Sequence, residues 1–169
     1  MTIELRPLTA ADAEAHCAGE DELTVRWLTG GYGDVEGTIE FFEGLAANAE
    51  AGIGKRGLGI WKSGRLCGYI DYTLDIDDGI DADDVALAYA IYPWARGQGV
   101  AVEAVRLLCD VLRTNKIGTR AAIRVEPENT ASVRVAQKAG FTYLRDFRSN
   151  RDTHPDGTPL TFSLYLLDL

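Results

Sequence analysis

The chain has 169 residues, of which 46% are hydrophobic and 25% charged, and its formal net charge is −9. This length and composition are typical of a soluble globular protein, and we expect residues 1–169 to form a single domain. The negative charge argues against non-specific nucleic-acid binding. No apolar run approaches the ~20 residues of a membrane span, so no membrane partner is expected.

The N-terminus and the cysteines favour a cytoplasmic protein. Residues 1–6 lack the basic-then-apolar form of a secretory signal. The three cysteines are odd in number and widely scattered, and Cys67 and Cys109 lie in apolar patterns typical of small core residues. The two histidines are far apart and no C-x-x-C pair occurs, so a zinc site has almost no support.

The N-terminal half predicts a strand, two helices and a β-hairpin. Alternating apolar residues indicate the strands, and apolar residues three and four apart indicate the helices. Thr9 and Asp12 form a capping pattern at the start of the first helix. In chain order, these elements are expected at residues 2–6, 9–17, 38–52, 58–62 and 66–74.

An acidic loop is expected over residues 75–84. Its run Asp75-Ile76-Asp77-Asp78-Gly79 resembles the start of a calcium-binding loop. The glutamate that such a loop requires as its twelfth residue is replaced by Ala86. We therefore expect a solvated hairpin tip and no metal.

The C-terminal half opens with an almost wholly apolar run over residues 85–92, which predicts a strand buried on both faces. A glycine-punctuated turn, Arg96-Gly97-Gln98-Gly99, then leads into the longest amphipathic helix, ending at about Lys116. The remaining elements are expected as a strand at 121–125, a helix at 129–139 that Gly140 ends, and a hairpin of 141–148 with 160–167.

The glycine-punctuated turn predicts a phosphate site. Glycines let an anion approach the main chain, and the helix start offers unpaired N–H groups and a partial positive charge. The turn lacks the Lys-Ser or Lys-Thr pair of nucleotide hydrolases. The dinucleotide pattern would need a glycine where the chain has Val102. A different phosphorylated ligand is therefore expected.

Two motifs carry a resemblance to a known family. Arg96-x-x-Gly99-x-Ala101 matches a Q/R-x-x-G-x-G/A signature, and here the chain resembles the GCN5-related N-acetyltransferases (GNAT), which bind the pyrophosphate of acetyl-CoA at this position. Residues 129–141 are similar to the N-x-x-S-x-x-x-x-x-K-x-G-F segment of the RimJ/RimL-type branch. The resemblance implies an α/β fold, with a mixed, mostly antiparallel twisted sheet and helices on both faces.

The resemblance also implies a function. An acetyl-CoA-dependent N-acetyltransferase would transfer the acetyl group directly, in a ternary complex, to a primary amine on a small molecule or a protein N-terminus. The alternative is a non-catalytic acyl-CoA-binding module, because many family members place a tyrosine acid where this chain has Ala136. The C-terminal hairpin could pair the edges of two copies in a homodimer.

The charge distribution is consistent with an acetyl-CoA-dependent N-acetyltransferase. Residues 1–84 hold 18 acidic and 6 basic side chains, whereas residues 85–169 hold 8 acidic and 11 basic ones. A basic half fits a polyanionic coenzyme, and an acidic half fits a cationic amine substrate. The alternative interpretation is that the acidic residues only solvate the surface.

Site residues follow from the resemblance. Coenzyme contacts, mainly through the backbone, are expected along the strand and around the pyrophosphate at Ala90, Ile91, Tyr92, Arg96, Gly97, Gln98, Gly99, Val100 and Ala101. Asn129 and Ser132 would lie near the pantetheine and the sulfur, with Ser132 as the candidate catalytic donor to the thiolate. Both residues could instead serve only the helix start.

The sequence offers several candidates for the general base and for the lining of the acceptor pocket. Asp71, Asp84 and Glu126 are candidates for the base, which could also act through one water. Aromatic residues at strand spacing could line the acceptor pocket or belong to the core; they are Trp27, Tyr69, Tyr72 and Tyr89.

Overall fold

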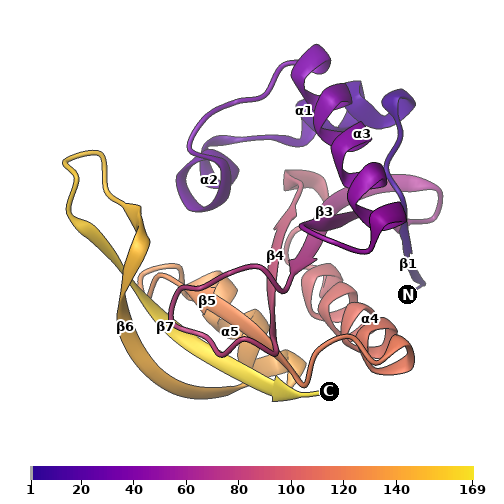
Figure 1. Ribbon diagram of the computed structural model, residues 1–169. Coiled ribbons are helices and arrows are strands. Elements are labelled where there is room, and N and C mark those ends of the chain that lie inside the picture. The colour runs from indigo at the N-terminus through magenta and orange to yellow at the C-terminus, as the bar shows by residue number, and fades with distance from the viewer. Residues whose placement is uncertain (1) are drawn as a thin grey trace.

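The computed structural model describes residues 2–169, so Met1 of the predicted N-terminal segment lies outside the described residues. The chain forms a seven-stranded sheet in the order β1-β2-β3-β4-β5-β7-β6 (Figure 1). Every neighbouring pair is antiparallel except β4 and β5, which run parallel. The mixed, mostly antiparallel sheet expected from the sequence is confirmed.

The strands are β1 (Ile3–Arg6), β2 (Arg56–Lys62), β3 (Arg65–Thr73), β4 (Asp84–Ile91), β5 (Arg120–Val125), β6 (Thr142–Thr153) and β7 (Pro159–Asp168). The α-helices are α1 (Ala13–Gly19), α2 (Glu22–Thr24), α3 (Val35–Ala51), α4 (Val100–Asn115) and α5 (Thr130–Ala139). Short 3-10 turns η1 (Ala10–Asp12) and η3 (Pro93–Ala95) precede α1 and α4, and α2 continues as a π-helical turn, η2 (Val25–Thr29).

The segment formed by α2 and η2 was not predicted. Its side chains Leu23 and Leu28 are exposed, at 50% and 40%, so its apolar residues do not form a stripe that faces the core. Without that periodicity a short helix leaves no pattern in the sequence. Its one local signal is Asp21, whose carboxylate accepts a hydrogen bond from the Thr24 N–H as an N-cap.

Helices cover both faces of the sheet (Figure 1). The neighbouring residues Tyr69 and Ile70 of β3 point to opposite faces, and each belongs to a different buried cluster. Ile70 packs in the larger cluster, which includes Val105 and Leu108 of α4. Tyr69 packs with Phe42 of α3 in the smaller one. The predicted helices on both faces are therefore confirmed.

The parallel strands β4 and β5 separate along their length. They pair only from Asp84, opposite Arg120, to Leu87, opposite Ile123, although β4 continues to Ile91. The first four residues of β4 are buried and the last four are only half-buried. The expectation of a strand buried along its whole length is wrong for this second half, because a cavity replaces the missing strand neighbour.

The acidic loop between β3 and β4 is exposed at Asp75, Asp77 and residues 81–83, as expected from the sequence, but Asp78 is buried. Asp78 is 1% exposed, and its carboxylate accepts hydrogen bonds from Arg124 Nη1 at 2.5 Å, Ser149 Oγ at 2.7 Å and the Asn150 N–H at 2.9 Å. The carboxylate therefore ties the loop to β5 and β6.

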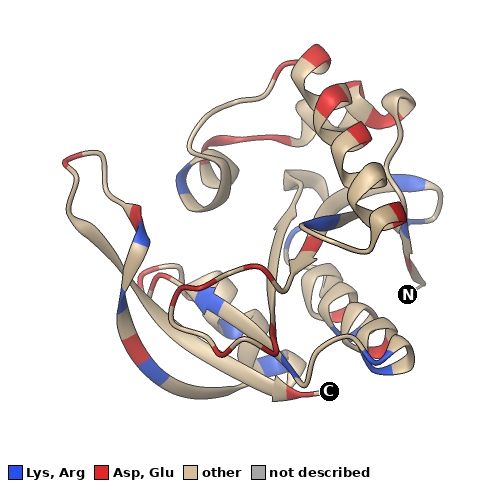
Figure 2. Ribbon diagram, viewed as in Figure 1, with Lys and Arg blue, Asp and Glu red and all other residues tan. Residues whose placement is uncertain are grey.

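Charged residues follow the division seen in the sequence. Acidic side chains mark α1, α3 and the loop after β3, and basic side chains occur on α5 and β6 (Figure 2). Among the described residues, no helix combines the length and apolar character that crossing a membrane would require.

Candidate functional site

The turn before α4 presents unpaired main-chain donors. Gly97 and Gly99 have φ angles of 73° and 77°, in the left-handed region that favours glycine. The first backbone bond of the helix runs from the Glu103 N–H to Gly99 O at 3.2 Å, so the N–H groups before Glu103 lack helical partners. A Cβ at Gly97 would meet nothing within 4 Å, which leaves the approach open. This geometry suits an anion.

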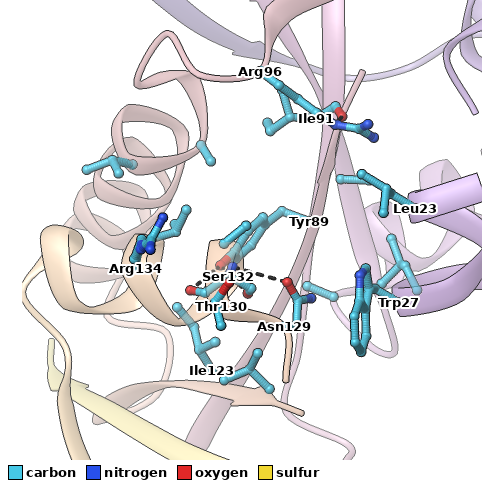
Figure 3. A pocket seen from close by; sticks show the side chains of 18 of the residues that line it. Leu23, Trp27, Tyr89, Ile91, Arg96, Ile123, Asn129, Thr130, Ser132 and Arg134 are labelled. Carbon is cyan, nitrogen blue, oxygen red and sulfur yellow. Dashed lines mark hydrogen bonds between the residues drawn. The ribbon is translucent and has the colours of Figure 1, made fainter. Parts of the chain in front are cut away.

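A cavity of about 630 Å³ lies beside this turn, where β4 and β5 separate. Figure 3 shows it between the end of β4, the start of α4, α5 and the segment of α2 and η2. Most of the residues expected from the sequence line it: Ala90, Ile91, Arg96, Gly97, Gly99, Val100, Ala101, Asn129 and Ser132. Residues of both sequence motifs thus line the same cavity.

Tyr92 and Gln98 do not line this cavity. Tyr92 is 1% exposed, its hydroxyl lies 2.7 Å from Nδ1 of His16, and its N–H donates to Cys67 O of β3. Gln98 turns away, because Oε1 accepts from Lys62 Nζ at 2.6 Å and Nε2 donates to Trp94 O at 2.9 Å. The contact expected at Tyr92 therefore has neither a free N–H nor a facing side chain.

Strand alternation identifies which β4 groups face the cavity. Backbone groups of an antiparallel strand point alternately to its two neighbours. Because the Tyr92 N–H points to β3, the groups of Ala90 do so too, and those of Tyr89 and Ile91 point toward the gap. The guanidinium of Arg96 donates to Ile91 O at 2.8 Å from that side. The backbone groups of Tyr89, which the sequence suggested only as pocket lining, thus face the gap, whereas those of Ala90 face β3.

Ser132, in the first turn of α5, lines the cavity. The Ser132 N–H donates to Asn129 Oδ1 at 3.2 Å, so Asn129 does cap α5, as one interpretation of the sequence held. The Ser132 hydroxyl has a partner of its own, since Oγ lies 2.8 Å from the phenol oxygen of Tyr89 (Figure 3). Burial raises the pKa of Tyr89 to about 12. Tyr89 therefore stays protonated at neutral pH.

Two cations of α5 were missed as site residues. Arg134 and Lys138 line the cavity four residues apart, which places them on one face of the helix. Figure 3 shows Arg134 on the α4 side of the cavity. The sequence signal that could have found them was this spacing next to Ser132, on the helix that follows the second motif.

A second hollow of about 1280 Å³ adjoins the first. The two share lining residues on η2, β4, β5, the loop after β5 and β7: Trp27, Leu28, Leu87, Ala88, Arg124, Glu126, Glu128 and Phe162. The second hollow, which we call the acidic groove, also contains Asp71 and Asp152. Its four carboxylates outnumber the cations Arg26, Lys55 and Arg124 that also line it, and Lys55 and Arg124 lie 3.6 and 3.8 Å from Asp71 and Asp152.

The structure separates the three candidate bases. The Asp84 carboxylate is buried and bound by Arg120, from Nε at 2.7 Å and from Nη2 at 2.9 Å, and it lines neither hollow. Asp71 lines the acidic groove with its side chain 4% exposed and 3.6 Å from Lys55 Nζ. Burial raises the pKa of Asp71 despite the nearby lysine. Asp71 and Glu126 therefore remain as candidates.

The aromatic candidates divide in the same way. Trp27 lines both hollows, with the guanidinium of Arg26 4.4 Å from its ring centre. Tyr69 and Tyr72 are buried core residues of β3 that line neither hollow. In residues 2–169, no cluster of three or more histidine, cysteine, aspartate or glutamate side chains is placed to hold a metal ion.

Comparison with known proteins identifies the family of the chain. The model of a family described as "Acetyltransferase (GNAT) domain" matches residues 2–142. Among curated proteins, none matches the chain by sequence. The sequence therefore matches the family model but no individual curated protein.

Solved structures share the fold. RimJ from Mycobacterium smegmatis, in complex with CoA-disulfide, is 23% identical with a TM-score of 0.79, covering 98% of this chain and 81% of that one. An acetyl transferase from Salmonella typhimurium that modifies the N-terminal serine of a ribosomal protein is 17% identical, with a TM-score of 0.82 and coverages of 100% and 96%. The aminoglycoside acetyltransferase AAC(6')-Ib, in complex with coenzyme A, is 18% identical, with a TM-score of 0.77 and coverages of 99% and 95%.

Proposed function

Because the chain belongs to the acetyltransferase (GNAT) family, we propose that it is an acetyl-CoA-dependent N-acetyltransferase that transfers the acetyl group directly to a bound primary amine. The observation that carries this proposal is the shared wall between the cavity and the acidic groove. A donor in the first hollow and an acceptor in the second would meet where β4 and β5 separate. Holding two reactants in this way lowers the barrier by several kcal/mol.

The residues of the cavity fit the coenzyme. The unpaired N–H groups at the start of α4 and the open approach to Gly97 suit a diphosphate. The gap-facing groups of Tyr89 and Ile91 suit an amide-containing arm that lies along β4. Acetyl-CoA, when bound, supplies the acetyl group as a thioester.

The remaining residues prepare the reaction. Ser132 donates a hydrogen bond at the place where the thiolate would leave, and the Tyr89 hydroxyl supports it at 2.8 Å. Asp71 accepts the proton of the amine, directly or through one water, because burial raises the pKa of its carboxyl and makes it a stronger base than an ordinary aspartate. Glu126, which lines both hollows, is the other candidate.

The acceptor is a primary amine that carries positive charge before it reacts. The acidic groove supports this class because Glu126 and Glu128 line it without forming an ion pair to the groove's cations, which are Arg26, Lys55 and Arg124. Its volume of about 1280 Å³ is large enough for a small polycationic molecule or for the first residues of a protein. The solved relatives act on substrates of both kinds, since one is named for aminoglycosides and another for an N-terminal serine.

Two measurements test the function. Calorimetry should show that the chain binds CoA, and thiol release from acetyl-CoA should accelerate with at least one member of a panel of aminoglycosides and short peptides. Tight CoA binding without turnover on any amine would instead support the non-catalytic module that the alanine at position 136 suggests. Absence of CoA binding would reject both functions.

Cytoplasmic location and a homodimer stay predictions. β6 is one of the two edge strands of the sheet and belongs to the C-terminal hairpin, so two copies could pair through it. Light scattering measures the molecular mass of the purified protein in solution, and a mass of one copy would reject the dimer.

A further inference from the structure

The guanidinium of Arg96, the basic residue of the phosphate-binding signature, is already engaged by the protein. Its Nε donates to Ile91 O at 2.8 Å. Its Nη1 and Nη2 donate to the two carboxylate oxygens of Asp21, at 2.5 and 2.8 Å. Such a paired arrangement is the strongest geometry available to an arginine and a carboxylate. Three of its five N–H groups are thus engaged, and Nη2 also lies 3.5 Å from Thr24 Oγ1.

Asp21 connects this arginine to the start of α2. Its Oδ1 also accepts hydrogen bonds from the N–H and the hydroxyl of Thr24, both at 3.1 Å. The hydrogen bond from Arg96 holds the pKa of Asp21 well below its ordinary value. The carboxylate is therefore charged at neutral pH, and it joins the end of β4 to the segment of residues 22–29.

Residues 22–29 bury few side chains. Leu23 and Leu28 are 50% and 40% exposed, Val25 and Trp27 are half-buried, and Thr24 is the buried residue of the segment, at 6%. Segments with few buried apolar contacts open locally at low free-energy cost. The pairing of Arg96 with Asp21 therefore contributes a large share of what keeps this segment in place.

The same segment forms part of both hollows. Leu23 and Thr24 line the coenzyme cavity, residues 25–30 line the acidic groove, and Trp27 and Leu28 line both. A shift of residues 22–29 would change the acceptor side of the site, whereas the turn at Gly97 belongs to α4 and would remain.

We propose that Arg96 is a positioning residue for the acceptor wall, which it holds against the end of β4 through Asp21. The positive charge for the coenzyme phosphates comes instead from Arg134 and Lys138, together with the N–H groups before α4. This inference rests on the proposed function and assigns separate roles within that site.

The test compares two variants that break the pair in different ways. Arg96→Ala removes the guanidinium, while Asp21→Asn removes the charge but keeps a side chain that caps α2 well. Hydrogen exchange of the amides of residues 22–30 in the free protein should accelerate by roughly fivefold in both, since a partly exposed pair contributes up to ~1 kcal/mol. Calorimetry should show that their CoA dissociation constants stay within about twofold of the parent value.

Two further variants complete the design. Arg134→Ala should weaken CoA binding by roughly fivefold or more and leave the exchange of residues 22–30 unchanged. Arg113→Ala, which breaks an ion pair with Asp110 on α4 outside both hollows, should change neither quantity. It controls for the loss of one surface arginine.

Two results would overturn the inference. One is unchanged exchange of residues 22–30 in both Arg96→Ala and Asp21→Asn. The other is a tenfold or larger loss of CoA affinity in Arg96→Ala but not in Asp21→Asn, because the arginine would then be a phosphate ligand. Failure of the parent protein to bind CoA would reject the proposed function, and the exchange measurement would still decide the role of Arg96.

Discussion

The phenol oxygen of Tyr89 lies 2.8 Å from the hydroxyl oxygen of Ser132 and 3.4 Å from the carbonyl oxygen of the same residue. The carbonyl can only accept, so the Tyr89 hydroxyl is the donor in the longer contact, whereas either hydroxyl can donate in the shorter one. When Tyr89 donates to Ser132 Oγ, the proton of Ser132 is free to point into the cavity. A β4 tyrosine thus supports the serine in a chain that has alanine at position 136.

Replacing Ser132 with alanine should lower kcat about tenfold, because a hydrogen bond to the leaving thiolate contributes about 1.4 kcal/mol in the transition state. The CoA dissociation constant should change less than twofold on the same scale. Tyr89→Phe should lower kcat about threefold alone and should have no further effect in the Ser132→Ala background.

Tyr72→Phe is the matched control for this pair, because Tyr72 is a buried tyrosine of the neighbouring strand that lines neither hollow. Its kcat should equal that of the parent. Equal losses from Tyr89→Phe with and without Ser132 would show that the two hydroxyls act independently.

Adding a methyl group at Gly97 should weaken CoA binding. The residue has a φ of 73° and an open approach, so alanine there costs about 1–2 kcal/mol of stability and places Cβ in the path of the diphosphate. We expect at least a tenfold higher CoA dissociation constant by calorimetry, since 1.4 kcal/mol corresponds to about tenfold.

Gly64→Ala separates backbone strain from coenzyme contact. Gly64 lies in the turn between β2 and β3 with a φ of 77°, and a Cβ there also meets nothing within 4 Å. Both variants should lose similar thermal stability, and Gly64→Ala should bind CoA normally. Equal CoA affinity in the two variants would remove Gly97 from the coenzyme site.

Asp71→Asn should change how both the activity and the stability of the protein depend on pH. Burial raises the pKa of Asp71, so the folded chain binds this proton more tightly than the unfolded chain does. The stability of the parent therefore falls as pH rises between the ordinary aspartate pKa and the raised one. The melting temperature of Asp71→Asn relative to the parent should increase over that interval.

Kinetic measurements on the same variant distinguish the two candidate bases, Asp71 and Glu126. Loss of Asp71 should lower kcat/KM about a hundredfold near neutral pH and remove the acidic limb of its pH profile. Glu126→Gln is the comparison, and it should keep that limb. A lost limb in Glu126→Gln alone would transfer the role to Glu126.

Asp78→Asn should destabilise the fold. The carboxylate is 1% exposed and faces Arg124 Nη1 at 2.5 Å, so neutralising it leaves a partly buried cation with a weaker partner. Breaking such a pair costs about 3–5 kcal/mol, which denaturant unfolding measures. Asp77→Asn, at the exposed neighbouring position, should change stability by less than about 0.5 kcal/mol.

The sequence by itself determined the strands, the long helices and the glycine turn before α4. Apolar periodicity identified the strands and long helices, and the glycine positions identified the turn before α4, because these signals come from residues close together in the chain. The two motifs at 96–101 and 129–141 were enough to place Ser132 and the glycine turn beside one cavity.

Only the tertiary structure decided which atoms meet. The partner of Arg96 is Asp21, far away in the sequence, and no local pattern couples the two. Asp84 and Asp71 look alike as candidate bases until one is found paired with Arg120 and the other facing the acidic groove. Side-chain partners of this kind depend on strand register and on the packing of distant elements, which short-range propensity does not encode.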